Sequence, residues 1–219
     1  MVRLRSGHVV RLRQVRPGDA AALAAAYANL GEQSRYRRFF TLLPELPESV
    51  LEAATDVDHV DHEALVALPL LADEIVGECR FVRLADRADT ADLAVTIVDE
   101  WQGRGLGTEL LARLSERALE EGIKNFTAEV LAENRAMLGM LDDLGRVEAE
   151  LAGPVVSARI KIAEADRPVP QELLDLLAAV TRGEVVTIPA PLRRLIEVTD
   201  AIAKIVLLPV AAVLRAARH

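Results

Sequence analysis

Cysteine and aromatic residues are scarce in this sequence. Its single cysteine, Cys79, excludes an intramolecular disulfide and any zinc site built from several cysteines. The strand-like run around Cys79 favours a buried, unreactive thiol. Only one Trp, two Tyr and four Phe are present, so the core is expected to consist mainly of Ala, Leu and Val.

Basic charge and long apolar runs are also lacking. The net charge of -8 argues against a nucleic-acid-binding protein, which would need a basic stripe, but it is compatible with a pocket for one anionic cofactor. The longest uncharged apolar run, Ile205–Leu214, is half the length of about 20 residues that a membrane span needs. Residues 1–16 lack the continuous apolar core of a signal peptide. We therefore expect a cytoplasmic protein that does not span a membrane.

What the sequence does contain is an alternation of strand and helix patterns. Apolar alternation predicts strands, and i, i+3, i+4 spacing between capping residues predicts helices. The predicted strands cover residues 8–15, 64–71, 75–84, 91–98, 126–131, 147–151 and 155–162, with a polar turn at 85–90. The predicted helices cover 17–30, 32–40, 47–55, 105–121 and 135–144. This order indicates an α/β domain over residues 1–163.

Residues 164–219 form a second predicted region. A linker-like stretch is followed by two amphipathic stretches, 171–181 and about 192–216. We expect a helical extension that packs on the domain or pairs with a second subunit in a homodimer. A membrane-surface role is less favoured because basic residues are thinly spread along the last stretch.

The most informative motif is Gln-Gly-Arg-Gly-Leu-Gly at residues 102–107, between a β-branched strand and a periodic helix. Glycines at such a turn let the main chain approach an anion, and the helix N-terminus adds partial positive charge. The motif therefore predicts a pyrophosphate site. A dinucleotide fingerprint would need glycine where Thr108 stands, and the P-loop and protein-kinase motifs are absent. A plain tight turn is the remaining alternative.

Residues 91–107 resemble the acetyl-CoA signature of the GNAT (Gcn5-related N-acetyltransferase) superfamily. Its core pattern, Q/R-x-x-G-x-G/A, is met by Gln102, Gly105 and Gly107, and Asn134 followed by Gly145 resembles the family's next motif. Residues 34–40 and 57–62 are similar to the bacterial protein-lysine acetyltransferase (Pat) branch. The resemblance implies a mixed, mostly antiparallel central sheet flanked by helices over residues 8–162.

The resemblance also implies a set of site residues. Acetyl-CoA would be the co-substrate, contacted by Ile97, Val98, Gln102, Gly103, Arg104, Gly105, Leu106, Gly107, Thr108 and Asn134. In the family a local splay near Ile97 and Val98 offers main-chain groups to the pantetheine and to the thioester oxygen. An acidic residue near the start of the same strand accepts the proton of the amine, and Asp92 matches it. Asp is shorter than the usual Glu, so we expect a water relay.

Three further positions qualify this picture. Many relatives carry a tyrosine that protonates the leaving thiolate, whereas this chain has Leu141 at that position. Tyr36 and Phe39 either shape the acceptor cleft or pack in the core. The segment Asp58–Glu63 contains two histidines and three acidic residues, but we expect a solvated turn and no metal site.

The predicted function is transfer of an acetyl or similar short acyl group from CoA to an amine. A protein lysine, a peptide N-terminus and a small amine all remain open as acceptors. The alternative is a non-catalytic acyl-CoA-binding module that kept the cofactor turn and lost the acid.

Overall fold

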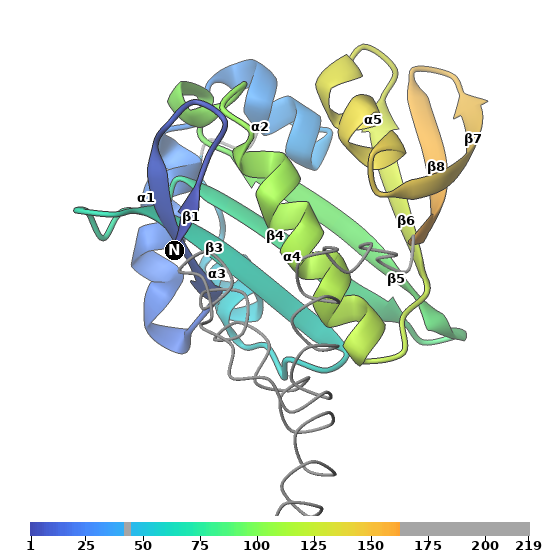
Figure 1. The fold of residues 1–219 in the computed structure, drawn as a ribbon, viewed down its shortest axis with the longest axis horizontal. Helices are drawn as coiled ribbons and strands as arrows, with labels where there is room; N and C mark the ends of the chain where they lie inside the picture. Colours follow the sequence, from blue (N-terminus) through green and yellow to red (C-terminus); the bar gives the residue numbers. More distant parts are fainter. Residues whose placement is uncertain (42–44, 163–219) are drawn as a thin grey trace, which may run out of the picture. The chain divides into compact units, whose positions relative to one another are not determined.

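The computed structural model describes residues 1–41 and 45–162, and its strands form one eight-stranded sheet (Figure 1). The strand order is β1-β2-β3-β4-β5-β6-β8-β7, and every neighbouring pair is antiparallel except β5 with β6. The strands are β1 Val2–Arg3, β2 Val9–Gln14, β3 His62–Pro69, β4 Gly77–Leu84, β5 Arg87–Ile97, β6 Asn125–Leu131, β7 Gly145–Ala152 and β8 Val155–Ile162. The predicted mixed, mostly antiparallel sheet is confirmed. The predicted helical extension, 164–219, lies outside the described residues.

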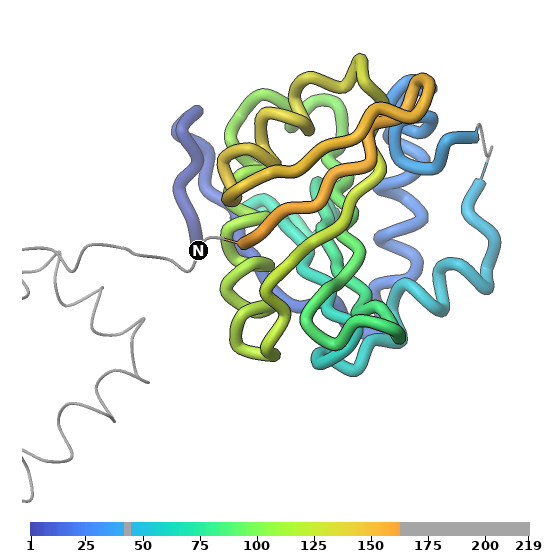
Figure 2. The backbone as a smooth tube through the Cα atoms, turned by 90° about the vertical axis from the view of Figure 1, so that its right-hand side faces the viewer, coloured from blue at the N-terminus to red at the C-terminus, as the bar shows by residue number. Residues whose placement is uncertain are grey.

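Five α-helices flank the sheet in the described part of the chain. They are α1 Ala20–Ala28, α2 Glu32–Phe39, α3 Glu48–Thr55, α4 Leu106–Glu120 and α5 Arg135–Asp142, with short 3-10 helices η1 Pro17–Asp19 and η2 Asp99–Trp101. The edge-on view shows α1 and α3 on one face of the sheet and α4 on the other (Figure 2). None of these helices is long and apolar enough to cross a bilayer.

Strand β3 is buried on both of its faces. Leu65 and Ala67 point into the core under α4, while Ala64, Val66 and Leu68 point into a second core under α1 and α3. Successive strand residues face opposite sides of a sheet, so an apolar run without polar alternation is what a central, doubly covered strand requires.

Helix α4 covers the larger core with an aliphatic stripe. Leu106, Leu110 and Leu114 are almost completely buried, and they recur at the helical period. Beneath the helix lies Cys79, whose thiol faces the carbonyl oxygen of Leu110 at 3.5 Å. Burial raises the pKa of the Cys79 thiol well above its ordinary value. The expectation of a buried cysteine is confirmed, and the raised pKa agrees with a thiol of low reactivity.

Strand β1 and the early start of β5 differ most from the prediction. Strand β1 was not anticipated, because two residues give no periodicity to read; it pairs with β2 through Val2 and Val10. The polar residues 85–90 were expected to form a turn, but β5 already begins at Arg87. Thr90 in this stretch is buried and pairs with Asn125 of β6. Pairing on both edges of β5 therefore overrides the polar composition.

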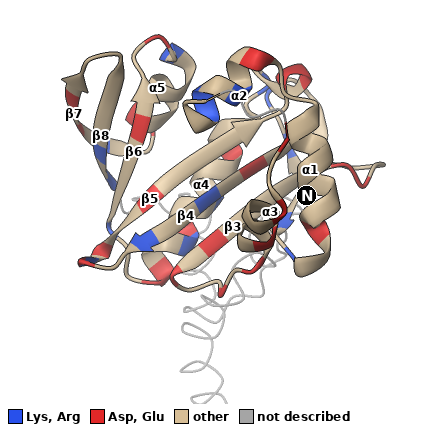
Figure 3. Ribbon diagram, turned by 180° about the vertical axis from the view of Figure 1, so that it is seen from behind, with Lys and Arg blue, Asp and Glu red and all other residues tan. Residues whose placement is uncertain are grey.

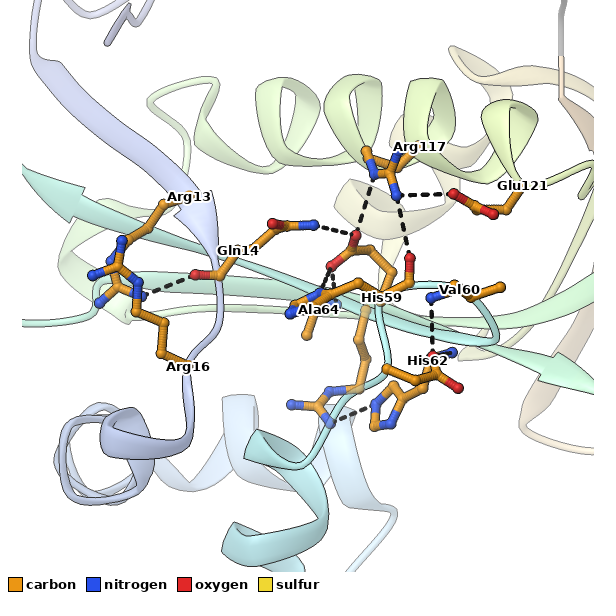
Figure 4. Close-up of polar contacts among 12 residues, drawn as sticks. Arg13, Gln14, Arg16, His59, Val60, His62, Ala64, Arg117 and Glu121 are labelled. Carbon is orange, nitrogen blue, oxygen red and sulfur yellow. Dashed lines mark hydrogen bonds and ion pairs between the residues drawn. The ribbon is translucent and has the colours of Figure 1, made fainter.

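Residues 58–61 form a bend before β3 (Figure 4), but the predicted solvated turn does not extend to Glu63, which lies in β3 with a fully buried carboxylate. Glu63 accepts hydrogen bonds from Gln14 Nε2 at 2.9 Å and Arg117 Nε at 3.2 Å, and its Oε1 lies 2.7 Å from His59 Nδ1. Burial alone would raise the pKa of Glu63, but these hydrogen bonds lower it below its ordinary value. This network, which we call the Glu63 cluster, fastens α4 to β3.

The two histidines of this segment, His59 and His62, contact different partners. His62 Nε2 accepts a hydrogen bond from the Arg80 guanidinium at 3.2 Å, whereas His59 faces Glu63. Burial, helped by the charge of Arg80, lowers the pKa of His62. Within residues 1–41 and 45–162, no group of three or more His, Cys, Asp or Glu side chains is arranged to hold a metal ion.

Candidate active site

Strands β5 and β6 separate soon after they meet. They pair in parallel only from Thr90–Asp92 to Asn125–Thr127, although β5 continues to Ile97 and β6 to Leu131. In Figure 1, β6 and its neighbours β8 and β7 turn away from β5. Among residues 1–41 and 45–162, the edge of β5 beyond Asp92 therefore has no strand partner on this side, and its main-chain groups are available to a ligand.

The direction of the main-chain groups on β5 follows from its other neighbour. The N–H of Val98 donates to the carbonyl oxygen of Val76 at 3.0 Å, which places it on the β4 side. Because hydrogen-bonded pairs alternate in an antiparallel ladder, the N–H groups of Leu93, Val95 and Ile97 point away from β4; that of Leu93 is used in the Asp92–Thr127 pairing with β6, which leaves those of Val95 and Ile97 on the open side. Of the main chain around Ile97 and Val98, the N–H of Val98 is therefore used by β4, while the N–H groups of Ile97 and Val95 are available to a ligand.

A cavity of about 1270 Å³ fills the space where β5 and β6 diverge. It is lined by residues from both faces of the sheet: Gly105, Leu106, Gly107 and Met140 belong to the α4 and α5 side, and Arg38, Arg80 and Asp92 to the side of α2. The cavity therefore runs from the glycine turn to the opposite face. We call its two sides the turn wall and the α2 wall.

The glycine turn has the backbone shape that the sequence predicted. Gly103 has φ of 68° and Gly105 has φ of 86°, a region that favours glycine, and α4 begins at Leu106 directly after it. The first N–H groups of a helix have no intrahelical acceptor and carry partial positive charge. Together with Gly107 and Thr108, which also line the cavity, they form a fitting cradle for a pyrophosphate.

The side chain of Gln102 fixes this turn to the end of β5. Its Nε2 lies 3.0 Å from the carbonyl oxygen of Ile97, 3.0 Å from Asp99 Oδ1 and 3.1 Å from Ser34 Oγ. Ser34 in turn donates to Asp99. The amide of Gln102 thus holds the turn, the strand and α2 together, which accounts for glutamine at the first position of the motif.

The side chain of Arg104 points out of the cavity. Its guanidinium lies over the Trp101 ring, 5.1 Å from the centroid, and donates to His8 Nε2 at 2.8 Å. Arg104 does not line the cavity, so its predicted contact with a cofactor is limited to the main chain.

Arg5, and not the side chain of Arg104, places a positive charge beside the glycine turn. A Cβ on Gly105 would lie 3.6 Å from Cγ of Arg5, and Arg5 lines the cavity beside the glycine turn. It comes from the connection between β1 and β2, about one hundred residues before the motif, so no local pattern in the sequence could have identified it. Its positive charge is suited to a phosphate group.

Asp92 lies at the narrow end of the opening, where β5 and β6 part. Its carboxylate is exposed, lines the cavity and accepts a hydrogen bond from the hydroxyl of Thr127 on β6. Directly opposed residues share a face of the sheet, so Asp92 points to the same side as its partners Val82 and Thr127. A carboxylate here can accept a proton from an amine that approaches from the α2 side.

The remaining predicted residues are divided between the cavity and the core. Asn134 lines the cavity and caps α5, accepting a hydrogen bond from the N–H of Met137 at 3.3 Å. Leu141, which stands where many relatives carry tyrosine, is completely buried. Tyr36 does not line the cavity, and Phe39 packs edge-on against Tyr27 with ring centroids 5.3 Å apart.

A second cavity of about 320 Å³ adjoins the first. It lies between α1–α3 and β4, it is mostly apolar, and it includes Phe39 and Val98. The two cavities share Arg38, Arg80, Val82 and Thr96. The predicted residues Phe39 and Val98 therefore belong to a neighbouring space on the α2 side.

Comparison with known proteins agrees with this geometry. The family model for the "Acetyltransferase (GNAT) domain" matches residues 10–147. The chain is similar to Acetyltransferase Pat of Mycolicibacterium smegmatis, with 32% identity over 182 residues, 83% of this chain and 54% of that protein. The chain thus spans about half the length of this curated relative.

Two solved structures show the same fold. The GNAT domain of S. lividans PAT matches with a TM-score of 0.67 at 30% identity, over 74% of this chain and 95% of that one. The yncA protein of Salmonella typhimurium, determined with its cofactor acetyl-CoA, matches with a TM-score of 0.58 at 18% identity, over 74% and 98% of the two chains.

Proposed function

The chain belongs to the GNAT acetyltransferase family, with its similarity to Pat as the motifs indicated, and from that premise we propose that it transfers an acetyl group from acetyl-CoA to an amine. The observation that carries the proposal is the unpaired edge of β5, which leads from the glycine turn to Asp92. Such an edge suits an extended chain of alternating amides, which is the chemistry of the pantetheine arm.

The turn wall supports the donor half of the reaction. The N–H groups at residues 103–108 and the guanidinium of Arg5 suit the phosphates of CoA. The N–H of Val95 is suited to hydrogen-bond the thioester oxygen, and it stabilises the negative charge that develops there during attack.

Asp92 supports the acceptor half. A lysine amine has a pKa of about 10.4, so it must lose a proton before it can attack a thioester. The exposed Asp92 carboxylate accepts that proton through water, and the hydrogen bond from Thr127 holds it at the mouth of the opening. With Leu141 buried, the thiolate leaves without a tyrosine acid. This slows the last step without abolishing it, because a thiolate is a fair leaving group.

We propose a protein lysine as the acceptor, because of the similarity to Pat. A second candidate function, binding of acyl-CoA without turnover, is favoured by one observation, the buried Leu141 in place of an acid. The two differ in whether an amine is consumed.

The test measures release of free CoA thiol from acetyl-CoA, with a lysine peptide, a peptide with only a free N-terminus and a small amine as acceptors. Amine-dependent thiol release supports the transferase, and the acceptor with the highest kcat/KM identifies its class. Binding of CoA by calorimetry without amine-dependent release would instead establish the binding module.

A further inference from the structure

Helix α2 carries three arginines, which differ in how many of their donors are used. Arg35 is fully committed to the fold: its guanidinium donates to the carbonyl oxygens of Leu30 at 2.9 Å and Ala28 at 2.8 Å and lies over the Tyr27 ring. Arg37 and Arg38 line the cavity instead. Nε of Arg37 is buried and has no hydrogen-bond partner among the described residues. The helix therefore presents unused cationic donors to the cavity.

Arg38 lies where the two cavities meet. Its Nε donates to Thr96 Oγ1 at 3.1 Å and its guanidinium lies over the Phe39 ring, 4.8 Å from the centroid. In the part of the chain that the structure describes, its terminal NH2 groups make no hydrogen bond. Burial lowers the pKa of Arg38, and the nearby Arg80 lowers it further, against an opposing effect of Glu78. An anion placed beside this buried guanidinium would therefore stabilise its charge.

The nearest carboxylate does not fill that role, because it pairs with another arginine. Glu78 forms an ion pair with Arg80, whose other donors go to His62 Nε2 and to the carbonyl oxygen of Ala54, each at 3.2 Å. Glu78 therefore balances Arg80. The charges of Arg37 and Arg38 remain for a ligand.

The opposite side of the cavity has the complementary charge. Glu129 of β6 and Glu148 and Glu150 of β7 line the cavity there, with the cation Arg159 of β8; on β5 the cavity is lined by Asp92 and by the cation Arg87. Seen from behind, α2 carries basic residues while β6 and β7 carry acidic ones (Figure 3). An amine is attracted to the acidic side and an anion to α2.

We propose that Arg37 and Arg38 form a carboxylate-binding subsite, so that the preferred acceptor carries an acidic group near its amine. This inference rests on the proposed transferase function and refines its acceptor. A guanidinium binds a carboxylate through two parallel hydrogen bonds, which matches the two free NH2 groups of Arg38.

The spacing of the subsite suits an acceptor. Asp92 and Thr96, the partner of Arg38, point to the same face of β5 and lie four residues apart, which is about 13 Å along a strand. A lysine followed by an acidic residue spans a distance of this order when the amine is at Asp92. The glycine turn lies on the α4 side of the cavity, whereas Arg38 lies with Asp92 on the α2 side, so we assign the carboxylate to the acceptor.

The experiment uses two capped peptides, Ala-Ala-Lys-Glu-Ala and Ala-Ala-Lys-Gln-Ala, with the wild type, Arg38→Gln and Arg38→Lys. Arg146→Gln, which removes an exposed charge on β7 outside the cavity, is the matched control. Thiol release gives kcat/KM for each peptide with acetyl-CoA. Anisotropy of labelled peptides, measured on the CoA-loaded protein, gives their affinity without turnover. A parallel series compares succinyl-CoA with acetyl-CoA on the Gln peptide.

We expect the wild type to prefer the Glu peptide by about tenfold or more, the usual size of a charge-assisted pair. Arg38→Gln should abolish the preference by lowering kcat/KM with the Glu peptide about tenfold more than with the Gln peptide, Arg38→Lys should keep part of the preference, and Arg146→Gln should keep all of it. Equal losses with both peptides would make Arg38 structural and overturn the proposal, as would no preference in the wild type.

A preference for succinyl-CoA alone would move the carboxylate to the acyl group and overturn the acceptor assignment. If no peptide is acetylated but the affinity preference is present and lost in Arg38→Gln, the subsite stands and the proposed transferase function fails. If both peptides are acetylated with the same kcat/KM, the proposed transferase function stands and the carboxylate-binding subsite is refuted.

Discussion

The turn wall and the α2 wall meet the same cavity with different kinds of groups. The turn wall presents main-chain N–H groups, held by Gly103 and Gly105 at positive φ and by the start of α4. The α2 wall and the end of β5 present charged side chains, with Asp92 and Arg38 on the same face of the sheet. One wall therefore depends on backbone shape and the other on side-chain identity.

This difference indicates that the two halves of the site can be changed independently by mutation. A backbone cradle tolerates substitution of most side chains around it and fails when a glycine is replaced. A wall of charged side chains can be altered one residue at a time without moving the chain. Donor binding and acceptor chemistry should therefore be separable by mutation.

Replacing Asp92 should affect only the acceptor half. Asp92→Asn keeps the size of the side chain and removes the proton acceptor, so kcat with an amine at neutral pH should fall about 100-fold, the lower end of what a general base contributes. The affinity for CoA, measured by calorimetry, should stay within twofold, and Asp142→Asn on exposed α5 should change neither quantity. An unchanged kcat would remove Asp92 from the mechanism.

Replacing Gly105 should affect the donor half first. Gly105 and Gly122 both have positive φ, of 86° and 78°, so alanine at either position costs about 1–2 kcal/mol of backbone strain. Only the Cβ at position 105 enters the cradle, beside Arg5. Gly105→Ala should therefore weaken CoA binding by about tenfold or more, while Gly122→Ala loses similar stability and keeps its affinity. Equal affinities in the two variants would refute the cradle.

Arg5 should contribute a smaller share of donor binding. Its side chain is exposed, so Arg5→Gln should weaken CoA binding by about threefold to fivefold, as expected for a solvated charge contact. Pantetheine, which lacks the phosphates, should bind equally to both proteins. Arg3→Gln in β1, outside the cavity, is the matched control. A loss that is the same for pantetheine would show that Arg5 only supports the turn.

The turn wall could be predicted from sequence and the α2 wall could not. The glycines at 103, 105 and 107 are read directly, because a left-handed backbone conformation and a close approach each require glycine locally. The neighbourhood of Arg38 depends on the fold: the register of β4 with β5 places Thr96 beside Glu78, and α2 then packs over both. No spacing along the chain contains that information.

The features of the turn wall that the sequence did not reveal also depend on contacts between distant parts of the chain. The resemblance implied main-chain contacts near Ile97 and Val98, but which N–H groups point outward is set by the phase of hydrogen bonding with β4, seen at Val76. Arg5 was missed because it reaches the turn from a hairpin at the start of the chain. Apart from β1, the element order was correct because it depends on local periodicity, and the strand that began earlier than expected, β5, is stabilised by neighbours on both sides.

The smallest expected effect on function comes from the Glu63 cluster, which also lies against α4 but far from its first turn. Arg117 is eleven residues from Leu106, about 16 Å along the helix. Glu63→Gln should therefore lower the free energy of unfolding at pH 7 by about 1 kcal/mol, through weaker hydrogen bonds to Arg117 and His59, and leave CoA affinity unchanged.

The pH dependence of stability gives the sharper readout. Because the pKa of Glu63 is lowered in the folded state, its contribution is complete above the unfolded pKa of about 4.3 and is lost as the pH falls below it. Urea unfolding midpoints of the wild type should therefore drop more steeply than those of Glu63→Gln between pH 5 and about pH 3. Parallel curves would mean that the carboxylate charge is not what fastens α4. Weaker CoA binding in this variant would mean that the turn wall depends on side chains far along the helix, and the contrast between the two walls would fail.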